Sequence, residues 1–201
     1  GVECGMMATK GAIERVHRHD GEILYDVIGG GPPDGICGSG ILDIAADLRG
    51  RGTIDQGGFM EKDVVVAPGG ETALGRDIVF TPADVREVQL AVAAIFAGIR
   101  ILLEQAGIEA VDVGRLYLAG GFGNYLRTES AIAVGLLPFA LRERIVPVGN
   151  SAGCGSRLAL RSLAFTREVN RVAESARYIE LSMRGDFNEA YVMSMSLETR
   201  G

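Results

Sequence analysis

The fold of this chain is constrained most strongly by one repeated pattern. Short apolar segments lead directly into glycine-rich turns and then into helix-forming stretches. One such segment, residues 116–119, leads through the glycines of residues 120–123 to a predicted helix over residues 128–136. A second, residues 145–148, leads into a predicted helix over residues 151–163. Strands that alternate with helices pair mostly in parallel through right-handed crossovers. The pattern therefore predicts an α/β sheet with largely parallel pairing.

The longest predicted helix covers residues 82–105. Thr81 is expected to cap its N-terminus, with Pro82 as the first helical residue and Asp84 at the third position, where a carboxylate meets the positive end of the helix. Gly107 is expected to end it. About 24 residues at ~1.5 Å each give roughly 36 Å, enough to cross a domain. Its apolar residues recur at spacings of three, four and seven and form one stripe: Val85, Val88, Val92, Ile95, Ile99, Leu102 and Leu103.

The remaining segments give weaker signals. A helix is expected over residues 39–48, and the segment around His17 and His19 is interpreted as a solvated turn. Residues 53–80 are interpreted as a loop with short strands, and they suggest no function. Further strands are predicted at residues 23–28, 64–66, 78–80, 178–181 and 191–195.

Composition excludes several classes of protein. The chain has 20 Lys and Arg against 26 Asp and Glu, a formal charge of −6, and no basic cluster that would bind nucleic acid. Its longest apolar run, residues 90–99, is too short for a membrane span of ~20 residues. Three cysteines without metal or disulfide spacing favour the reducing cytoplasm. Because the chain begins at Gly1 without an initiator Met, we expect a piece of a longer protein.

Glycine accounts for 29 of the 201 residues, roughly twice the usual share, and its clusters mark the candidate binding turns. Ligands of α/β sheets bind beyond the carboxyl ends of the strands, where glycine lets the backbone approach them closely. The alternative is that these glycines only make tight turns or close helix–sheet packing. The candidate ligand-binding residues are Gly120, Gly121, Phe122, Gly123 and Asn124 in one turn, Gly149, Asn150 and Ser151 in a second, and Gly38 and Ser39 in a third.

No catalytic or metal-binding set stands out. The glycine turns match neither the lysine-containing phosphate loop nor the dinucleotide fingerprint, which disfavours NAD. Cys37 and Cys154 lie near helix starts, where a thiolate would be favoured. The better interpretation is that both are small side chains that only fill space in the packing. The carboxylates that stand out by position are expected to be caps or surface groups: Asp43, Asp47, Asp55, Asp84 and Glu104.

Several motifs occur in an order that resembles one family. The chain resembles the C-terminal part of the reductive activators of corrinoid proteins, which are ferredoxin-like metal-binding proteins with an ATPase domain. That domain belongs to the superfamily of sugar kinases, heat-shock chaperones and actin. The motifs are Cys4-Gly5-Met6 with Gly11-Ala12-Ile13-Glu14, Gly35-Ile36-Cys37-Gly38-Ser39-Gly40-Ile41-Leu42-Asp43, Leu118-Ala119-Gly120-Gly121-Phe122-Gly123-Asn124-Tyr125, Gly149-Asn150-Ser151-Ala152-Gly153 and Tyr178-Ile179-Glu180-Leu181-Ser182.

This resemblance implies a ribonuclease-H-like half of an actin-like ATPase fold, with a mixed sheet flanked by helices. Residues 1–201 would be the C-terminal portion of that ATPase domain, with the iron–sulfur, linker and phosphate-loop regions upstream. The complete protein would use ATP or ADP with magnesium and a two-iron two-sulfur cluster to return cob(II)alamin to cob(I)alamin on a corrinoid protein. The resemblance matches residues 120–123 to the adenosine motif. The fragment alone would be inactive. Whether the full-length protein forms a homodimer stays open.

Two other functions stay open. Members of the family often carry a lysine where this chain has Val92, which favours a module that docks the corrinoid protein and has only vestigial nucleotide binding. The second alternative is an activator of an iron–sulfur dehydratase, which would need Cys37 or Cys154 as a ligand of a bridging cluster.

Overall fold

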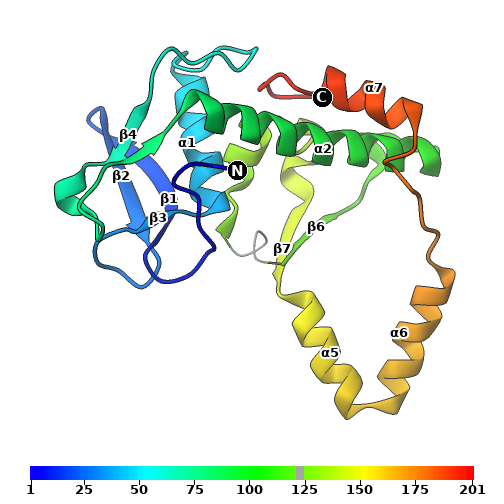
Figure 1. Ribbon diagram of the computed structural model, residues 1–201. Helices are drawn as coiled ribbons and strands as arrows, with labels where there is room; N and C mark the ends of the chain where they lie inside the picture. Colours follow the sequence, from blue (N-terminus) through cyan, green and yellow to red (C-terminus); the bar gives the residue numbers. More distant parts are fainter. Residues whose placement is uncertain (121–124) are drawn as a thin grey trace.

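The computed structural model describes residues 1–120 and 125–201, and Figure 1 shows a body crossed by one long helix with a helical hairpin projecting from it. Its strands are β1 (Ala12–His19), β2 (Glu22–Val27), β3 (Gly35–Ile36), β4 (Val64–Ala67), β5 (Ile78–Phe80), β6 (Leu116–Ala119) and β7 (Ile145–Gly149). Its helices are α1 (Gly38–Gly50), α2 (Pro82–Ala106), α4 (Thr128–Ala133), α5 (Ser151–Arg161), α6 (Leu163–Ser175) and α7 (Gly185–Met193), with short 3-10 helices at Gly69–Glu71, Ala110–Asp112 and Phe139–Arg144.

The strands of the described residues form three small sheets, which corrects the expectation of one largely parallel sheet. β2, β1 and β3 form a mixed sheet in that order, β4 pairs with β5 in antiparallel fashion, and β6 pairs with β7 in parallel. The β1–β2 pair is antiparallel because Asp20 and Gly21 make a two-residue turn, both with positive φ, of 49° and 88°. His17 and His19 lie on exposed positions of β1, so the predicted solvated turn was wrong.

The long helix α2 forms as predicted. The Thr81 hydroxyl accepts a hydrogen bond from the Asp84 amide (3.2 Å), and the Asp84 carboxylate accepts one from the Thr81 amide (2.9 Å). Gly107 ends the helix with a φ of 66°. Val85 and Val92 are fully buried in one core cluster that also draws on α1, α4, β1 and β5.

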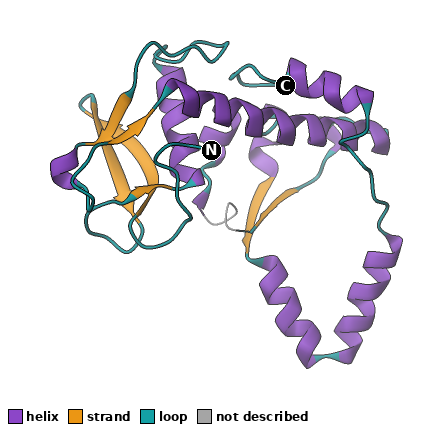
Figure 2. Cartoon of the chain, in the orientation of Figure 1, coloured by secondary structure: helices purple, strands orange, loops and turns teal. Residues whose placement is uncertain are grey.

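The C-terminal residues fold onto α2 instead of forming strands. Residues 191–193 belong to α7, which lies along α2 (Figure 2), and residues 178–181 have no regular structure, so both predicted strands were wrong. Helix formation suits this segment because Phe187 and Tyr191 are four residues apart, and their rings stack at 6.2 Å.

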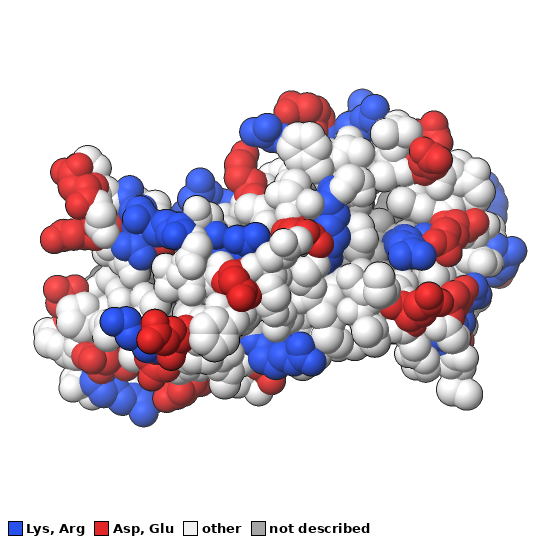
Figure 3. Space-filling view, turned by 90° about the horizontal axis from the view of Figure 1, so that it is seen from above, with Lys and Arg blue, Asp and Glu red and all other residues white. Residues whose placement is uncertain are grey.

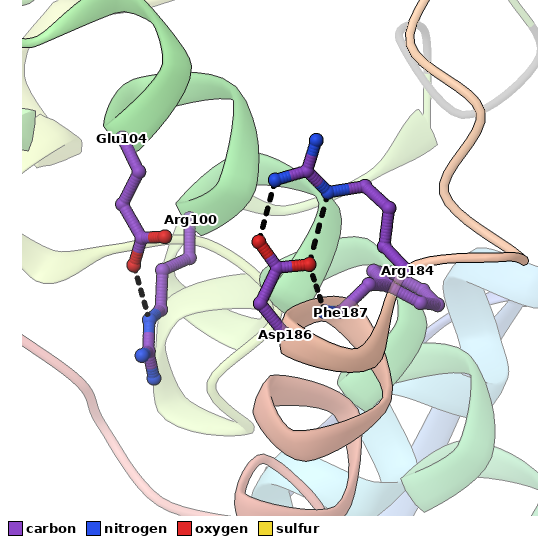
Figure 4. A network of polar contacts seen from close by, with 5 residues as sticks. All are labelled: Arg100, Glu104, Arg184, Asp186 and Phe187. Carbon is purple, nitrogen blue, oxygen red and sulfur yellow. Dashed lines mark hydrogen bonds and ion pairs between the residues drawn. The ribbon is translucent and has the colours of Figure 1, made fainter.

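Charged side chains mark the start of α7. Arg184 donates hydrogen bonds to both carboxylate oxygens of Asp186, and the Phe187 amide donates to the same carboxylate (Figure 4). The Arg184 hydrogen bonds are the main cause that lowers the pKa of Asp186. Arg100 and Glu104 form an ion pair on α2 nearby. On the face seen in Figure 3, acidic and basic side chains are interspersed.

A helical hairpin replaces the single helix predicted over residues 151–163. The break falls at Ser162, whose side chain accepts a hydrogen bond from the Phe165 amide and caps α6. α5 and α6 project from the body in Figure 1, and neither helix contains a buried residue. Within the described parts of the chain, no helix combines the length and apolar character needed to cross a lipid bilayer.

Candidate functional site

Two glycine turns meet at the carboxyl ends of the parallel strands β6 and β7. The Gly120 amide donates a hydrogen bond to the Gly149 carbonyl at 2.8 Å, and the two residues have φ values of 84° and 61°. Among the described residues other than its chain neighbours, no heavy atom lies within 4 Å of the place that a Cβ on Gly120 would occupy. Of the other candidates in this turn, Gly121, Phe122, Gly123 and Asn124 lie outside the described residues. The described part of the turn therefore leaves open space beside a backbone that glycine can adopt without strain.

The second turn leads straight into helix α5. Asn150 is exposed and caps this helix, since its side-chain oxygen accepts a hydrogen bond from the Gly153 amide at 2.9 Å. A Cβ on Gly153 would lie 2.7 Å from the Asn150 side chain, so a larger residue there would displace this cap. Ser151 is the exposed first residue of α5, which has no acidic side chain in its first turn. The positive end of α5 thus lies next to the Gly120–Gly149 contact.

The third pair of candidates, Gly38 and Ser39, begins helix α1. They line a cavity of about 210 Å³ together with Cys37 and Tyr125, the first described residue after the Gly120 turn. Ser39 is buried, and its hydroxyl lies 3.3 Å from the Cys37 sulfur. The start of α1 and the residue that follows the first glycine turn therefore share one cavity.

A buried carboxylate lies one helical turn beyond Ser39. Asp43 is 3% exposed, and it accepts hydrogen bonds from the Ser130 hydroxyl at 2.5 Å and from the Val16 amide at 3.2 Å. Burial raises the pKa of its carboxyl, while these two hydrogen bonds and the charges of Arg127 and Arg15 act in the opposite direction. The expectation that Asp43 is a cap or a surface group was therefore wrong.

A second cavity, of about 460 Å³, lies between α1, α2 and β6. Aliphatic side chains such as Ile41, Ala91 and Leu118 make up most of its wall, and Glu87 is the one charged side chain among the described residues that line it. Among the described residues of its wall there is no cationic side chain that could hold a phosphate group, and Gly38 of the candidate site lines this cavity as well.

The whole chain matches a known family. Residues 1–201 match the family described as the C-terminal domain of RACo, the ASKHA domain. The chain belongs to this family. Its mixed α/β fold is that of an actin-like ASKHA domain, as the sequence predicts.

Individual relatives agree with this assignment. The chain is 37% identical over 215 aligned positions to the corrinoid activation enzyme RamQ of Eubacterium limosum, an alignment that covers 96% of this chain and 36% of that protein. It also resembles a solved structure described as a reductive activator for corrinoid, iron-sulfur protein, with a TM-score of 0.90 and 36% identity. That match covers 98% of this chain and 34% of the other. The chain thus spans about a third of the length of these relatives.

The residues on which the two alternative functions depend differ in their burial. Val92 is fully buried in the core between α2 and its neighbours, where an aliphatic side chain contributes to packing. Cys37 is buried and Cys154 is exposed on α5. Among the described residues, no group of three or more His, Cys, Asp or Glu side chains is placed to hold a metal ion.

Proposed function

We propose that this chain is the C-terminal, nucleotide-binding part of an ATP-dependent reductive activator that returns cob(II)alamin of a corrinoid protein to cob(I)alamin. The proposal rests on the family membership and on one observation in particular, the joined glycine turns at the ends of β6 and β7. The names of the two relatives, a corrinoid activation enzyme and a reductive activator, support the choice of reaction.

The proposed nucleotide lies against the turn that begins at Gly120. A nucleoside needs a flat, close approach to the backbone, and no described residue outside the turn comes within 4 Å of the Cβ position of Gly120 to block it. The N-terminus of α5 and the start of α1 offer backbone amides near the same turn, and helix N-termini favour anionic groups such as phosphates. In this proposal the predicted residues Gly38, Ser39, Gly149, Asn150 and Ser151 belong to the nucleotide site.

The chemistry beyond nucleotide binding is assigned to the longer protein that we propose carries this chain. Phosphoryl transfer needs groups that hold Mg²⁺ and the terminal phosphate, and the described residues provide no set of carboxylates for the metal. We therefore place the phosphate loops and the two-iron two-sulfur cluster outside residues 1–201, and we expect this chain alone to be inactive. The corrinoid protein is the proposed partner.

Titration calorimetry of ADP into the complete protein that carries this sequence tests the proposal. The test variant is Gly120→Ala, and the control is Gly107→Ala, because both glycines have positive φ and open space around the missing Cβ. Both substitutions carry the same backbone strain of about 1–2 kcal/mol. We expect only Gly120→Ala to weaken ADP binding, by about tenfold or more. Equal affinities in the two variants, or no ADP binding by the unsubstituted protein, would refute the proposal.

A further inference from the structure

Three elements that are distant in the sequence meet at one buried carboxylate. Asp43 lies on α1, Val16 on β1, and Ser130 on α4, and all three residues are buried. One carboxylate oxygen of Asp43 accepts the hydrogen bond from the Ser130 hydroxyl, and the other accepts the one from the Val16 amide. Each oxygen therefore connects α1 to a different neighbour.

The hydrogen bond from the Val16 amide to Asp43 follows from the shape of the sheet. β3 has only two residues and pairs with Ala12 and Ile13, so it ends before it could accept a hydrogen bond from Val16. A buried amide without a hydrogen-bond partner destabilises the fold. Asp43 supplies the missing acceptor, which fixes α1 against the sheet.

The contact with α4 reaches the candidate site. Ser130 follows Gly120 by ten positions, at the third residue of α4, which begins at Thr128. Asp43 follows Ser39 by four positions, so the two side chains share one face of α1. The Asp43–Ser130 hydrogen bond therefore joins the helix that begins at Gly38 to the helix that follows the glycine turn.

We propose that Asp43 is a positioning residue for the nucleotide site, which holds the start of α1 and the segment after the Gly120 turn in a fixed relation through Ser130. It touches no ligand itself. The proposal rests on the proposed function, because α1 and α4, which Asp43 joins, are the elements that we place beside the nucleotide. A hydrogen bond to a buried carboxylate is suited to this task, since charged acceptors bind a hydroxyl strongly and at short distance.

The test combines ADP titration with amide hydrogen exchange in the complete protein. The variants are Asp43→Asn and Ser130→Ala, with Ser130→Thr as the conservative variant that keeps the hydroxyl. The control is Asp47→Asn, one turn further along α1, where Asp47 pairs with Arg18 and Arg51 near the surface. Circular dichroism at the assay temperature confirms that each variant is folded.

We expect Asp43→Asn and Ser130→Ala to weaken ADP binding by about tenfold, and their combination by no more than either alone. Ser130→Thr and Asp47→Asn should stay within about twofold of the unsubstituted protein. Without nucleotide, Asp43→Asn should speed amide exchange in α4 while exchange in the middle of α2 stays unchanged. A role confined to stability would lower the melting temperature and leave the ADP affinity unchanged.

The outcomes separate the two proposals. If the unsubstituted protein binds ADP and the Asp43 and Ser130 variants bind it equally well, the positioning role is wrong and the proposed function stands. Unchanged exchange in α4 would show that the Asp43–Ser130 contact does not hold that helix, which also overturns the role. If the unsubstituted protein binds no ADP, the proposed function fails, and the positioning role fails with it.

Discussion

Substitution of Gln89 by leucine should destabilise the chain strongly. Gln89 lies on α2 and is 5% exposed, and its side-chain amide donates hydrogen bonds to the Gly57 carbonyl (2.8 Å) and the Met195 carbonyl (2.7 Å). It therefore connects the loop after α1 and the C-terminal tail to the central helix. Leucine keeps about the same volume but cannot donate, so both carbonyls lose a partner.

Each of the two hydrogen bonds contributes about 1 kcal/mol net, and a buried group left without its partner costs about 1–3 kcal/mol. We therefore expect Gln89→Leu to lower the free energy of unfolding by about 2–4 kcal/mol. For a chain of this size, that corresponds to a decrease of about 5–15 °C in melting temperature.

Urea unfolding of the 201-residue chain, followed by circular dichroism, measures this loss. The control is Gln105→Leu, the same change on an exposed position of the same helix, which should alter stability by no more than about 0.5 kcal/mol. The reasoning is refuted if the two variants lose the same stability.

Two further predictions concern α1. Between the ordinary pKa of Asp43 in the unfolded chain and its raised folded pKa, the native state binds the proton more tightly, so stability should fall as pH rises. In urea titrations from about pH 4 to about pH 8, the unsubstituted chain should lose stability relative to Asp43→Asn, and parallel curves would contradict the buried environment. Gly40→Ala should cost about 1–3 kcal/mol, because a Cβ would lie 2.6 Å from the Ile13 carbonyl oxygen. Gly50→Ala, with open space at the end of the same helix, should cost nothing, and equal urea midpoints would contradict the packing.

Elements with strong local signals were predicted within a residue or two. The bounds of α2 follow from the cap at Thr81 and Asp84 and from the left-handed Gly107, and β6 has the predicted bounds. These signals lie within a few residues of the element that they delimit, so they fix its ends without contacts from distant parts of the chain.

Elements whose form depends on distant contacts were predicted less well. Residues 191–195 were predicted as a strand, yet packing against α2 makes residues 191–193 helical, and the spacing of Phe187 and Tyr191 was the signal that could have shown it. The Ser162 cap was likewise visible in the sequence but was placed inside a helix. The division into three sheets could not be predicted, because it depends on which distant segments pair, whereas the β1–β2 pair is local and follows from the Asp20–Gly21 turn.

In the candidate site, too, local features were predicted and contacts between distant residues were not. The sequence predicts the glycine turns at Gly120 and Gly149, but it gives no sign that the two share a hydrogen bond. Asp43 was missed because a single carboxylate on a helix usually faces solvent. Its position between Leu42 and Ile44, in a helix with apolar residues on most sides, was the available signal.

Photolabelling of the complete protein with an azido-adenine analogue of ADP tests the central claim most directly. The claim is that the adenine nucleoside lies on the backbone turn after Ala119, beside the start of α5. Trypsin would release residues 116–127 and residues 145–157 as separate peptides, since each follows an arginine and ends at one. We predict that mass spectrometry finds the label on one or both of these peptides and that excess ADP removes it. Label on other peptides, or label that excess ADP leaves in place, would contradict the account.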